Sequence, residues 1–225
     1  KMTTLTQTSL SSLKLLNQGK VRDIYEVDDE NILIVTTDRL SAFDVIMNEP
    51  IPFKGEVLTK MANFWFDKFS SLVSNHLTHK NPLDFVSKNE SYQVINRSIV
   101  AKKLKPIPIE VIVRGYLIGS SWKEYELSNS ICDIVLPTGL KLAEKLPNPI
   151  FTPSSKAEIG NQDENISFKE CENLIGKELT SQLSLISLDL YKKAYEFAYD
   201  KGIIIADTKF EFGLDSLGKI HIIDE

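Results

Sequence analysis

The sequence predicts a mixed fold of strands and helices in two parts. Near the N-terminus, an alternating apolar stretch and an apolar run flank the acidic turn 28–31, which predicts a β-hairpin. Apolar residues at helical spacing come next. Two prolines within 105–108 then separate two strand-like stretches and exclude helix between them. We therefore place a hinge there, with one part at 1–105 and the other at 106–225.

Each part contains a predicted amphipathic helix. The first follows Gly55, and we expect its apolar stripe to form core rather than a ligand site: Leu58, Met61, Ala62, Trp65, Phe69 and Leu72. The second should end at Gly202, a good C-terminal stop. Its stripe consists of Leu183, Ile186, Leu190, Ala194 and Phe197.

The stretch 137–165 is polar and marked by prolines. Loops of this length in a compact domain are often functional. Its hydroxyls, acids and Lys156 favour a loop that closes on substrate over the alternative, a solvated linker.

The C-terminal end carries the most informative pattern. An apolar run at 203–206, which we expect to be a buried strand, continues into Asp207, Lys209 and Glu211. Side chains on a strand alternate between its faces, so these three charges leave the same face. Unpaired buried charges are costly, which favours a partner or a ligand for them.

A turn after Leu214 and a second apolar strand predict a hairpin. With a four-residue loop after Leu214, Glu211 lies opposite Ile222. Lys209 then lies opposite Asp224, and the two carboxylates converge on one face. Hard oxygen ligands suit Mg²⁺ that carries nucleotide phosphates. A surface ladder of salt bridges is the alternative.

Two other segments carry cations suited to anions. Gly19, Lys20 and Arg22 open the first hairpin, where backbone amides and two cations would hold a triphosphate. A solvated strand start is the alternative, because the segment is not a P-loop. Arg114 leaves a buried strand toward Ser120, and this pair would bind a carboxylate or phosphate. The alternative is an arginine paired internally at a strand end.

Composition argues against several classes of function. A net charge of -5 and a pI near 5.4 argue against a nucleic-acid partner, which usually requires a basic face. No apolar run approaches the roughly 18 residues of a membrane span. Cys132 and Cys171 lack metal-type spacing and are typical of reduced thiols in a cytoplasmic protein. The histidines form no catalytic arrangement, and no Gly-x-Ser-x-Gly motif indicates a hydrolase.

Five ordered segments carry a family resemblance across nearly the whole chain. They are 19–25, 37–44, 107–114 with 119–120, 151–158 and 207–213. Together they closely resemble the SAICAR synthetase family of purine biosynthesis, the phosphoribosylaminoimidazole-succinocarboxamide synthases. Five motifs in the family's order are far more specific than any one of them.

The resemblance implies an α+β fold in two lobes, similar to protein kinases and ATP-grasp enzymes, with ATP between the lobes. An antiparallel N-terminal sheet at 1–105 would bind ATP, and a larger α+β lobe at 106–225 would bind substrate and metal. The family uses ATP to join L-aspartate to carboxyaminoimidazole ribonucleotide (CAIR). The products are SAICAR, ADP and phosphate. The implied partners are these small molecules, without nucleic acid or membrane, for a monomer or homodimer.

The resemblance also implies roles for single residues. The ATP-binding residues would be Gly19, Lys20, Arg22, Lys103 and Glu110. The Mg²⁺ ligands would be Glu211 and Asp224. The catalytic residues at the reacting end would be Lys209 and Asp207. The residues that bind or close on the other substrates would be Asp44, Arg114, Ser120 and Lys156.

Two features depart from the family pattern. Arg22 stands where the family often has lysine, which keeps the charge and changes the geometry. The family also continues beyond Glu225 with a further substrate-binding arginine, so we expect the natural C-terminus to lie beyond this residue. Two rival functions stay open: a kinase-like phosphotransferase with a hydroxyl acceptor, and a non-catalytic nucleotide-binding module.

Overall fold

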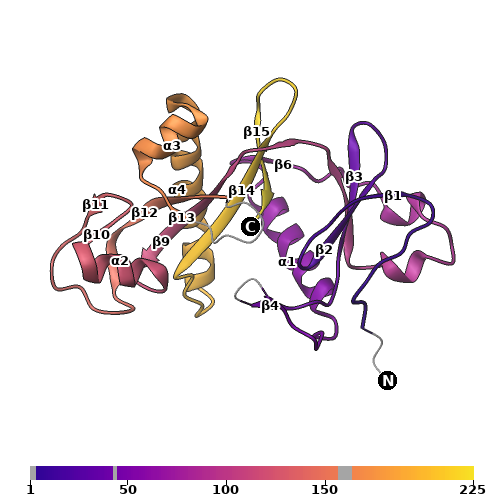
Figure 1. Cartoon of the computed structure of the whole chain (residues 1–225), viewed down its shortest axis with the longest axis horizontal. Helices are drawn as coiled ribbons and strands as arrows, with labels where there is room; N and C mark the ends of the chain where they lie inside the picture. Colours follow the sequence, from indigo (N-terminus) through magenta and orange to yellow (C-terminus); the bar gives the residue numbers. More distant parts are fainter. Residues whose placement is uncertain (1–3, 43–44, 157–163) are drawn as a thin grey trace. The chain divides into compact units, whose positions relative to one another are not determined.

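The computed structural model describes residues 4–42, 45–156 and 164–225 (Figure 1). The chain divides into two compact units, 1–105 and 106–225, and each is described by itself. Within the described residues, no helix has both the length and the apolar character that a membrane crossing needs.

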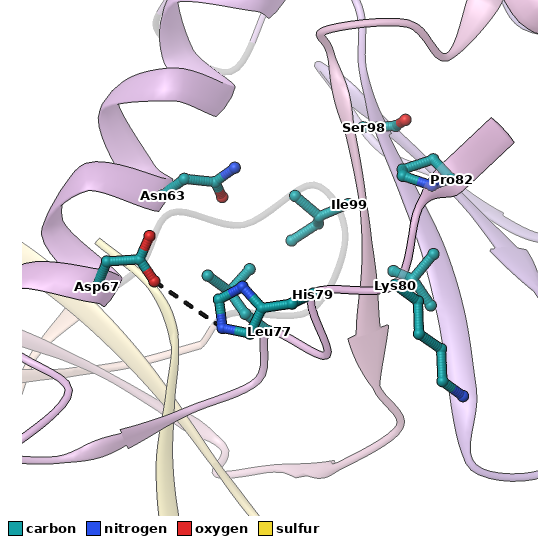
Figure 2. A pocket seen from close by; sticks show the side chains of 9 residues that line it. Asn63, Asp67, Leu77, His79, Lys80, Pro82, Ser98 and Ile99 are labelled. Atoms are coloured by element: carbon teal, nitrogen blue, oxygen red, sulfur yellow. Dashed lines mark ion pairs between the residues drawn. The ribbon is translucent and has the colours of Figure 1, made fainter.

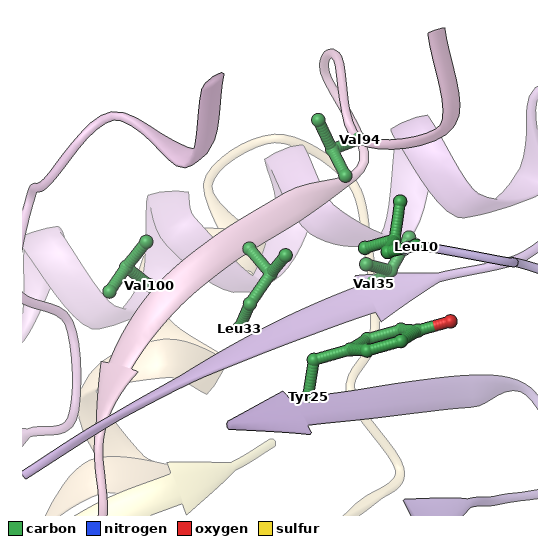
Figure 3. Packing of buried hydrophobic residues seen from close by; sticks show 6 residues of the cluster. All are labelled: Leu10, Tyr25, Leu33, Val35, Val94 and Val100. Carbon is green, nitrogen blue, oxygen red and sulfur yellow. The ribbon is translucent and has the colours of Figure 1, made fainter. Parts of the chain in front are cut away.

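The first unit is built on a four-stranded antiparallel sheet. Its strands, in spatial order, are β1 (Lys14–Gln18), β2 (Arg22–Glu26), β3 (Asn31–Thr36) and β7 (Ser98–Lys102). The hairpin predicted from the sequence is β2 with β3. A buried apolar cluster packs against the sheet and stabilises it (Figure 3), and it consists of Leu10, Tyr25, Leu33, Val35, Val94 and Val100.

Shorter elements complete the first unit. They are β4 (Ser41–Ala42) and its partner β5 (Val45–Ile46), β6 (Ser74–Asn75), and the 3₁₀ helices η1 (Pro82–Phe85) and η2 (Ser91–Gln93). β8 (Lys105–Pro106) spans the boundary between the units.

Helix α1 (Lys54–Lys68) forms where predicted, but the expected core face is wrong. Leu58 and Met61 are 43% and 51% exposed, whereas the buried residues of α1 are Gly55, Thr59 and Phe66. The reason is the close approach of Gly55 to the carbonyl of Thr36, where a Cβ would lie 2.2 Å from the oxygen. The helix therefore docks through Gly55, with Thr59 and Phe66 also buried, whereas Leu58 and Met61 lie outside the buried face.

The second unit contains a larger antiparallel sheet with helices. The strands run in the order β13 (Glu164–Asn165), β12 (Lys145–Ser155), β9 (Ile109–Tyr116), β14 (Asp207–Leu214) and β15 (Ile220–Asp224). The helices are α2 (Ser120–Ser128), α3 (Phe168–Ile175) and α4 (Lys177–Tyr199). A small hairpin joins β10 (Ser130–Ile131) to β11 (Ile134–Val135).

The two faces of this sheet differ sharply in polarity. Directly paired residues share a face, and on one face Val111 pairs with Phe210 while Val113 pairs with Phe151. Helices α3 and α4 contact this apolar face, and the ring of Phe151 packs edge-on against Phe168 of α3 at 6.0 Å. The other face therefore collects the polar residues of the same strands.

The run 203–206 is not the buried strand that the sequence predicted. The strand begins only at Asp207, and Ile203 and Ile204 are 58% and 57% exposed. Hydrogen bonds to two carbonyls hold the backbone here instead. The Ala206 oxygen accepts from two amides of β9, and the Ile205 oxygen accepts from the hydroxyl of a tyrosine on α4. These bonds fix the backbone without burying the two preceding side chains.

The prediction of a long loop at 137–165 is also wrong in part, because 145–155 forms strand β12. The register of β12 against β9 shifts between Lys145 and Ile150. Pro147 and Pro149 lie in this interval and cannot donate ladder hydrogen bonds, so the irregularity accommodates them. Of the expected closing loop, residues 157–163 lie outside the described residues.

Gly115 on β9 provides a test of how α4 packs on the sheet. A Cβ at this position would lie 1.9 Å from the hydroxyl of Tyr191, which donates to the Ile205 carbonyl at 2.7 Å. We predict that Gly115→Ala lowers the free energy of unfolding by about 2 kcal/mol through overpacking. Urea denaturation measures this change.

The matched control repeats Gly115→Ala in a Tyr191→Ala background. Without the tyrosine ring, the same substitution should cost less than about 1 kcal/mol, which gives a clear coupling free energy. Equal costs in both backgrounds would contradict the packing described.

Candidate active site

The polar face of the second unit gathers most of the residues that the sequence analysis selected. Cross-strand pairs place Glu110 beside Ser154, Asp207 beside Arg114, and Thr152 beside Ile112. By alternation, the shared face then carries Glu110, Arg114, Thr152, Ser154, Asp207, Lys209 and Glu211. A sheet with one apolar and one charged face presents the charged face for chemistry.

The two predicted metal ligands lie directly opposite each other, although the predicted register is wrong. Leu214 pairs with Ile220, one residue later than expected. Asp215 explains the longer turn, because its Oδ1 accepts from the amides of Leu217 and Lys219, both at 2.9 Å.

A β-bulge then places the two acids opposite each other across the hairpin. Phe212 pairs with Ile222, whereas the next pair is Glu211 with Asp224, so β15 carries one extra residue, Ile223. Lys209 is therefore not opposite Asp224, as the sequence had suggested. The two acids are paired across the hairpin, but through an irregular ladder and not in the predicted register.

Two lysines on this face pair with carboxylates. The Lys156 Nζ lies 2.5 Å from Glu211 Oε2, and the Lys209 Nζ lies 2.8 Å from Glu110 Oε2. The Lys156 and Glu211 side chains are 31% and 24% exposed, so this pair is partly shielded from water. The alternative of a salt-bridge ladder thus describes part of the geometry, and Glu211 has an ammonium partner.

The acid pair fits Mg²⁺ better than zinc. Within the described ranges, no group of three or more His, Cys, Asp or Glu residues is arranged to hold a metal. Mg²⁺ is typically held by one or two carboxylates, with waters and substrate phosphates completing the shell. Glu211 and Asp224, directly paired across two strands, supply that donor set.

Arg114 is the centre of a second polar cluster. Its Nε donates to Thr152 Oγ1 at 3.1 Å and its Nη2 to Ser120 Oγ at 3.3 Å. Its Nη1 lies 3.5 Å from Asp207 Oδ2. Burial lowers the pKa of the guanidinium, and the nearby Asp207 carboxylate opposes that shift. An arginine nevertheless stays charged at neutral pH. Arg114 is therefore a permanent positive charge on β9, next to Ser120 at the start of α2.

Thr152 is a member of this cluster that the sequence analysis did not select. It is fully buried, and its hydroxyl also donates to the Ile112 carbonyl at 3.0 Å. In the sequence, Thr152 is only one of several hydroxyl-bearing residues in the 151–158 motif, and Lys156 is more conspicuous there.

The remaining candidates lie in the first unit. Gly19 and Lys20 lie in the turn between β1 and β2, and Arg22 is the first residue of β2. We call residues 19–22 the 19–22 turn, in which the Gly19 amide donates to the Arg22 carbonyl at 2.7 Å. Lys103 pairs with Glu26 at 3.4 Å. The candidate Asp44 lies outside the described residues.

The first unit also contains a pocket of about 190 Å³, shown in Figure 2. It lies between α1, β7 and the connection before η1, and its lining includes Asn63, Asp67, His79 and Lys80. The His79 ring and the Asp67 carboxylate stand 4.0 Å apart and are mostly exposed. None of the predicted site residues lines this pocket.

A sequence model of the SAICAR synthetase family matches residues 15–225. The chain belongs to the SAICAR synthetase family. The phosphoribosylaminoimidazole-succinocarboxamide synthase of Methylobacillus flagellatus is 57% identical over 224 residues, which are 99% of this chain and 75% of that protein. The corresponding protein of Chromobacterium violaceum is 56% identical over 216 residues, or 96% of this chain and 76% of its own length.

Solved structures of the family share the fold. The SAICAR synthase of Saccharomyces cerevisiae, solved with SAICAR, matches with a TM-score of 0.90 at 45% identity, over 98% of this chain and 76% of that chain. A SAICAR synthetase in complex with ADP matches with a TM-score of 0.76 at 23% identity, over 93% of this chain and 79% of that chain. The α+β fold expected of the SAICAR synthetase family is thereby confirmed.

Both cysteines of this SAICAR synthetase family member are buried and unpaired in disulfides. Burial raises the pKa of the Cys132 thiol to about 12, with the Glu124 carboxylate acting in the same direction. The Cys132 amide donates to that carboxylate at 2.7 Å. A buried thiol with a raised pKa is a poor nucleophile, which argues against a covalent role for Cys132.

We predict that neither thiol reacts with a disulfide reagent in the native protein near neutral pH, because both are buried and the thiolate of Cys132 is scarce. The colour yield of the reagent measures this directly. Protein unfolded in guanidinium is the control and should release both thiols. Fast reaction of one thiol in the native protein would contradict the burial described.

Proposed function

We propose that this chain uses ATP to join L-aspartate to the carboxylate of CAIR, which yields SAICAR, ADP and phosphate. Relatives at 56–57% identity carry the name of this enzyme, and the related yeast structure contains SAICAR. The observation that carries the proposal is the polar sheet face. It combines an acid pair suited to a nucleotide-bound cation with a buried arginine suited to an anionic substrate.

The chemistry requires activation of a carboxylate, which is a poor electrophile. A carboxylate oxygen of CAIR attacks the γ-phosphorus of ATP, and ADP leaves, which forms an acyl phosphate. The neutral amine of L-aspartate then attacks the carbonyl carbon. The C–O bond to phosphate breaks, phosphate leaves, and the amine loses a proton as the amide forms. Positioning and charge stabilisation supply most of the catalysis of such phosphoryl transfers.

The acid pair of β14 and β15 would serve the ATP side of the reaction. We propose that Glu211 and Asp224 hold Mg²⁺, which would offset negative charge on the phosphates when bound. Lys156, now on Glu211, would then be released toward the substrates. In the first unit, Lys20 and Arg22 would contact ATP phosphates, with Gly19 allowing close approach.

The remaining roles follow the chemistry of each group. Arg114 and Ser120 would bind the phosphate of the ribonucleotide, supported by the N-terminus of α2. Asp207 and Lys209 would orient the reacting carboxylate and amine. Lys103 and Glu110 would line the adenine through backbone groups, and Asp44 would contact substrate.

The direct test is the reaction itself. We predict that purified protein forms SAICAR, detected by mass spectrometry, only when CAIR, L-aspartate and ATP are all present. Phosphate release should fall to background when L-aspartate is omitted, because the acyl phosphate then lacks its acceptor. ADP formation without aspartate and without release of free phosphate would favour the phosphotransferase, because the phosphoryl group then stays on a hydroxyl acceptor. ATP binding without turnover would favour the non-catalytic module.

The acid pair provides a second prediction. Glu211→Gln keeps the size of the side chain and removes one anionic oxygen ligand, so it should lower kcat/KM by about a hundredfold or more. It should also weaken Mn²⁺ binding in the presence of ATP by about tenfold, measured by electron paramagnetic resonance.

Asp189→Asn is the matched control for Glu211→Gln. Asp189 lies on α4, and its Oδ2 pairs with the Lys193 Nζ of the same helix at 3.2 Å. This variant should leave kcat/KM and the Mn²⁺ affinity within about twofold of the wild-type values, because exposed ion pairs on a helix contribute little. An unchanged Mn²⁺ affinity in Glu211→Gln would refute the assignment of the acid pair.

A further inference from the structure

Arg39 holds the 19–22 turn from inside the first unit. Its Nη2 donates to the Gly19 carbonyl at 2.9 Å and its Nε to the Lys20 carbonyl at 3.0 Å. Its Nη1 donates to the Thr6 carbonyl at 2.7 Å. Nη2 also pairs with Asp23 Oδ1 at 2.7 Å, and only 10% of the Arg39 side chain is exposed. One buried guanidinium thus binds two consecutive carbonyls of the turn.

The other two carbonyls of the turn also have protein partners. The Val21 oxygen accepts from the amide of Thr37 at 2.9 Å and from its hydroxyl at 2.7 Å. The Arg22 oxygen accepts from the Gly19 amide at 2.7 Å. All four carbonyls of the 19–22 turn are therefore engaged by donors of the protein.

This arrangement sets the electrostatic character of the turn. In a trans peptide, the C=O of one residue and the N–H of the next point in opposite directions. Because the carbonyls of Gly19 and Lys20 point toward Arg39, the N–H groups of Lys20 and Val21 point away from it. An exposed carbonyl oxygen would repel a phosphate, whereas outward N–H groups attract one.

The guanidinium is itself held in place by a buried network. Asp23 is fully buried, and its Oδ2 accepts from the Thr8 hydroxyl at 2.6 Å. That hydroxyl also bonds to the hydroxyl of Tyr25 at 2.6 Å. Asp23 balances the charge of Arg39, and a buried ion pair with satisfied hydrogen bonds resists rearrangement. The turn is thus fixed before any ligand arrives.

We propose that Arg39 is a positioning residue for phosphate binding. It draws the carbonyls of the 19–22 turn inward, so that the turn presents N–H groups and the Lys20 side chain to the phosphates of ATP. Arg39 acts through the backbone and does not itself contact the nucleotide. The inference rests on the proposed function, because it concerns how the ATP side of the site is organised.

The test compares Arg39→Lys with Arg97→Lys. Arg97 is an equally buried arginine of the same unit, but it pairs with Asp38 at 3.0 Å and Glu56 at 3.4 Å rather than with the turn. Both variants should lower the Tm. The dissociation constant for ATP, measured by calorimetry, should rise about tenfold or more in Arg39→Lys and stay within about twofold in Arg97→Lys.

Hydrogen exchange tests the proposal in the wild-type protein, so this measurement does not require any variant to fold. In the wild-type protein, ATP should slow exchange at the amides of Lys20 and Val21. Equal loss of ATP affinity in both variants, or no protection of these amides in ATP-bound protein, would overturn the role of Arg39. A wild-type protein that binds no ATP would instead refute the proposed function on which the inference rests.

Discussion

The β-bulge at Ile223 is the constraint on which the candidate site of the second unit depends. In a regular ladder, Glu211 would face Ile223, and Asp224 would leave the opposite face. The extra residue re-aims Asp224 without changing the pairing nearer the turn. Bulges are enriched next to active sites for this reason.

The turn that precedes the bulge is organised by Asp215. This carboxylate accepts from two backbone amides and from the His221 ring, which lies at 2.9 Å. The His221 hydrogen bond is the largest of the effects that hold the pKa of Asp215 below its ordinary value. One acidic residue thus sets the length of the turn and thereby the register from which the bulge departs. The histidine serves this turn, which agrees with a structural rather than catalytic role.

The polar face holds many charges because most of them are paired. Glu211 with Lys156, Glu110 with Lys209 and Asp207 with Arg114 each bring opposite charges together on one face of the sheet. Each such pair contributes only modestly to the stability of the fold when it is partly exposed. Their value to the proposed reaction is that a cation or a phosphate can replace one member of a pair, so substrate binding exchanges partners instead of burying new charge.

The sequence predicted features with local causes and missed those with distant ones. The alternation at 207–211 and the stripe of α4 follow from the period of a strand or helix, and both were recognisable. The docking face of α1 was not, because it depends on the contact of Gly55 with Thr36. Likewise, the role of Arg39 depends on carbonyls about twenty residues away in the chain, and no local pattern marks it.

The most direct test of the central claim is a crystal structure of the protein with a non-hydrolysable ATP analogue and Mn²⁺. The anomalous signal of manganese would locate the ion independently of any fitted geometry. Our account predicts one ion within about 2.2 Å of a carboxylate oxygen from each of Glu211 and Asp224, with phosphate oxygens completing its shell. An ion bound elsewhere, with these two carboxylates turned apart, would contradict it.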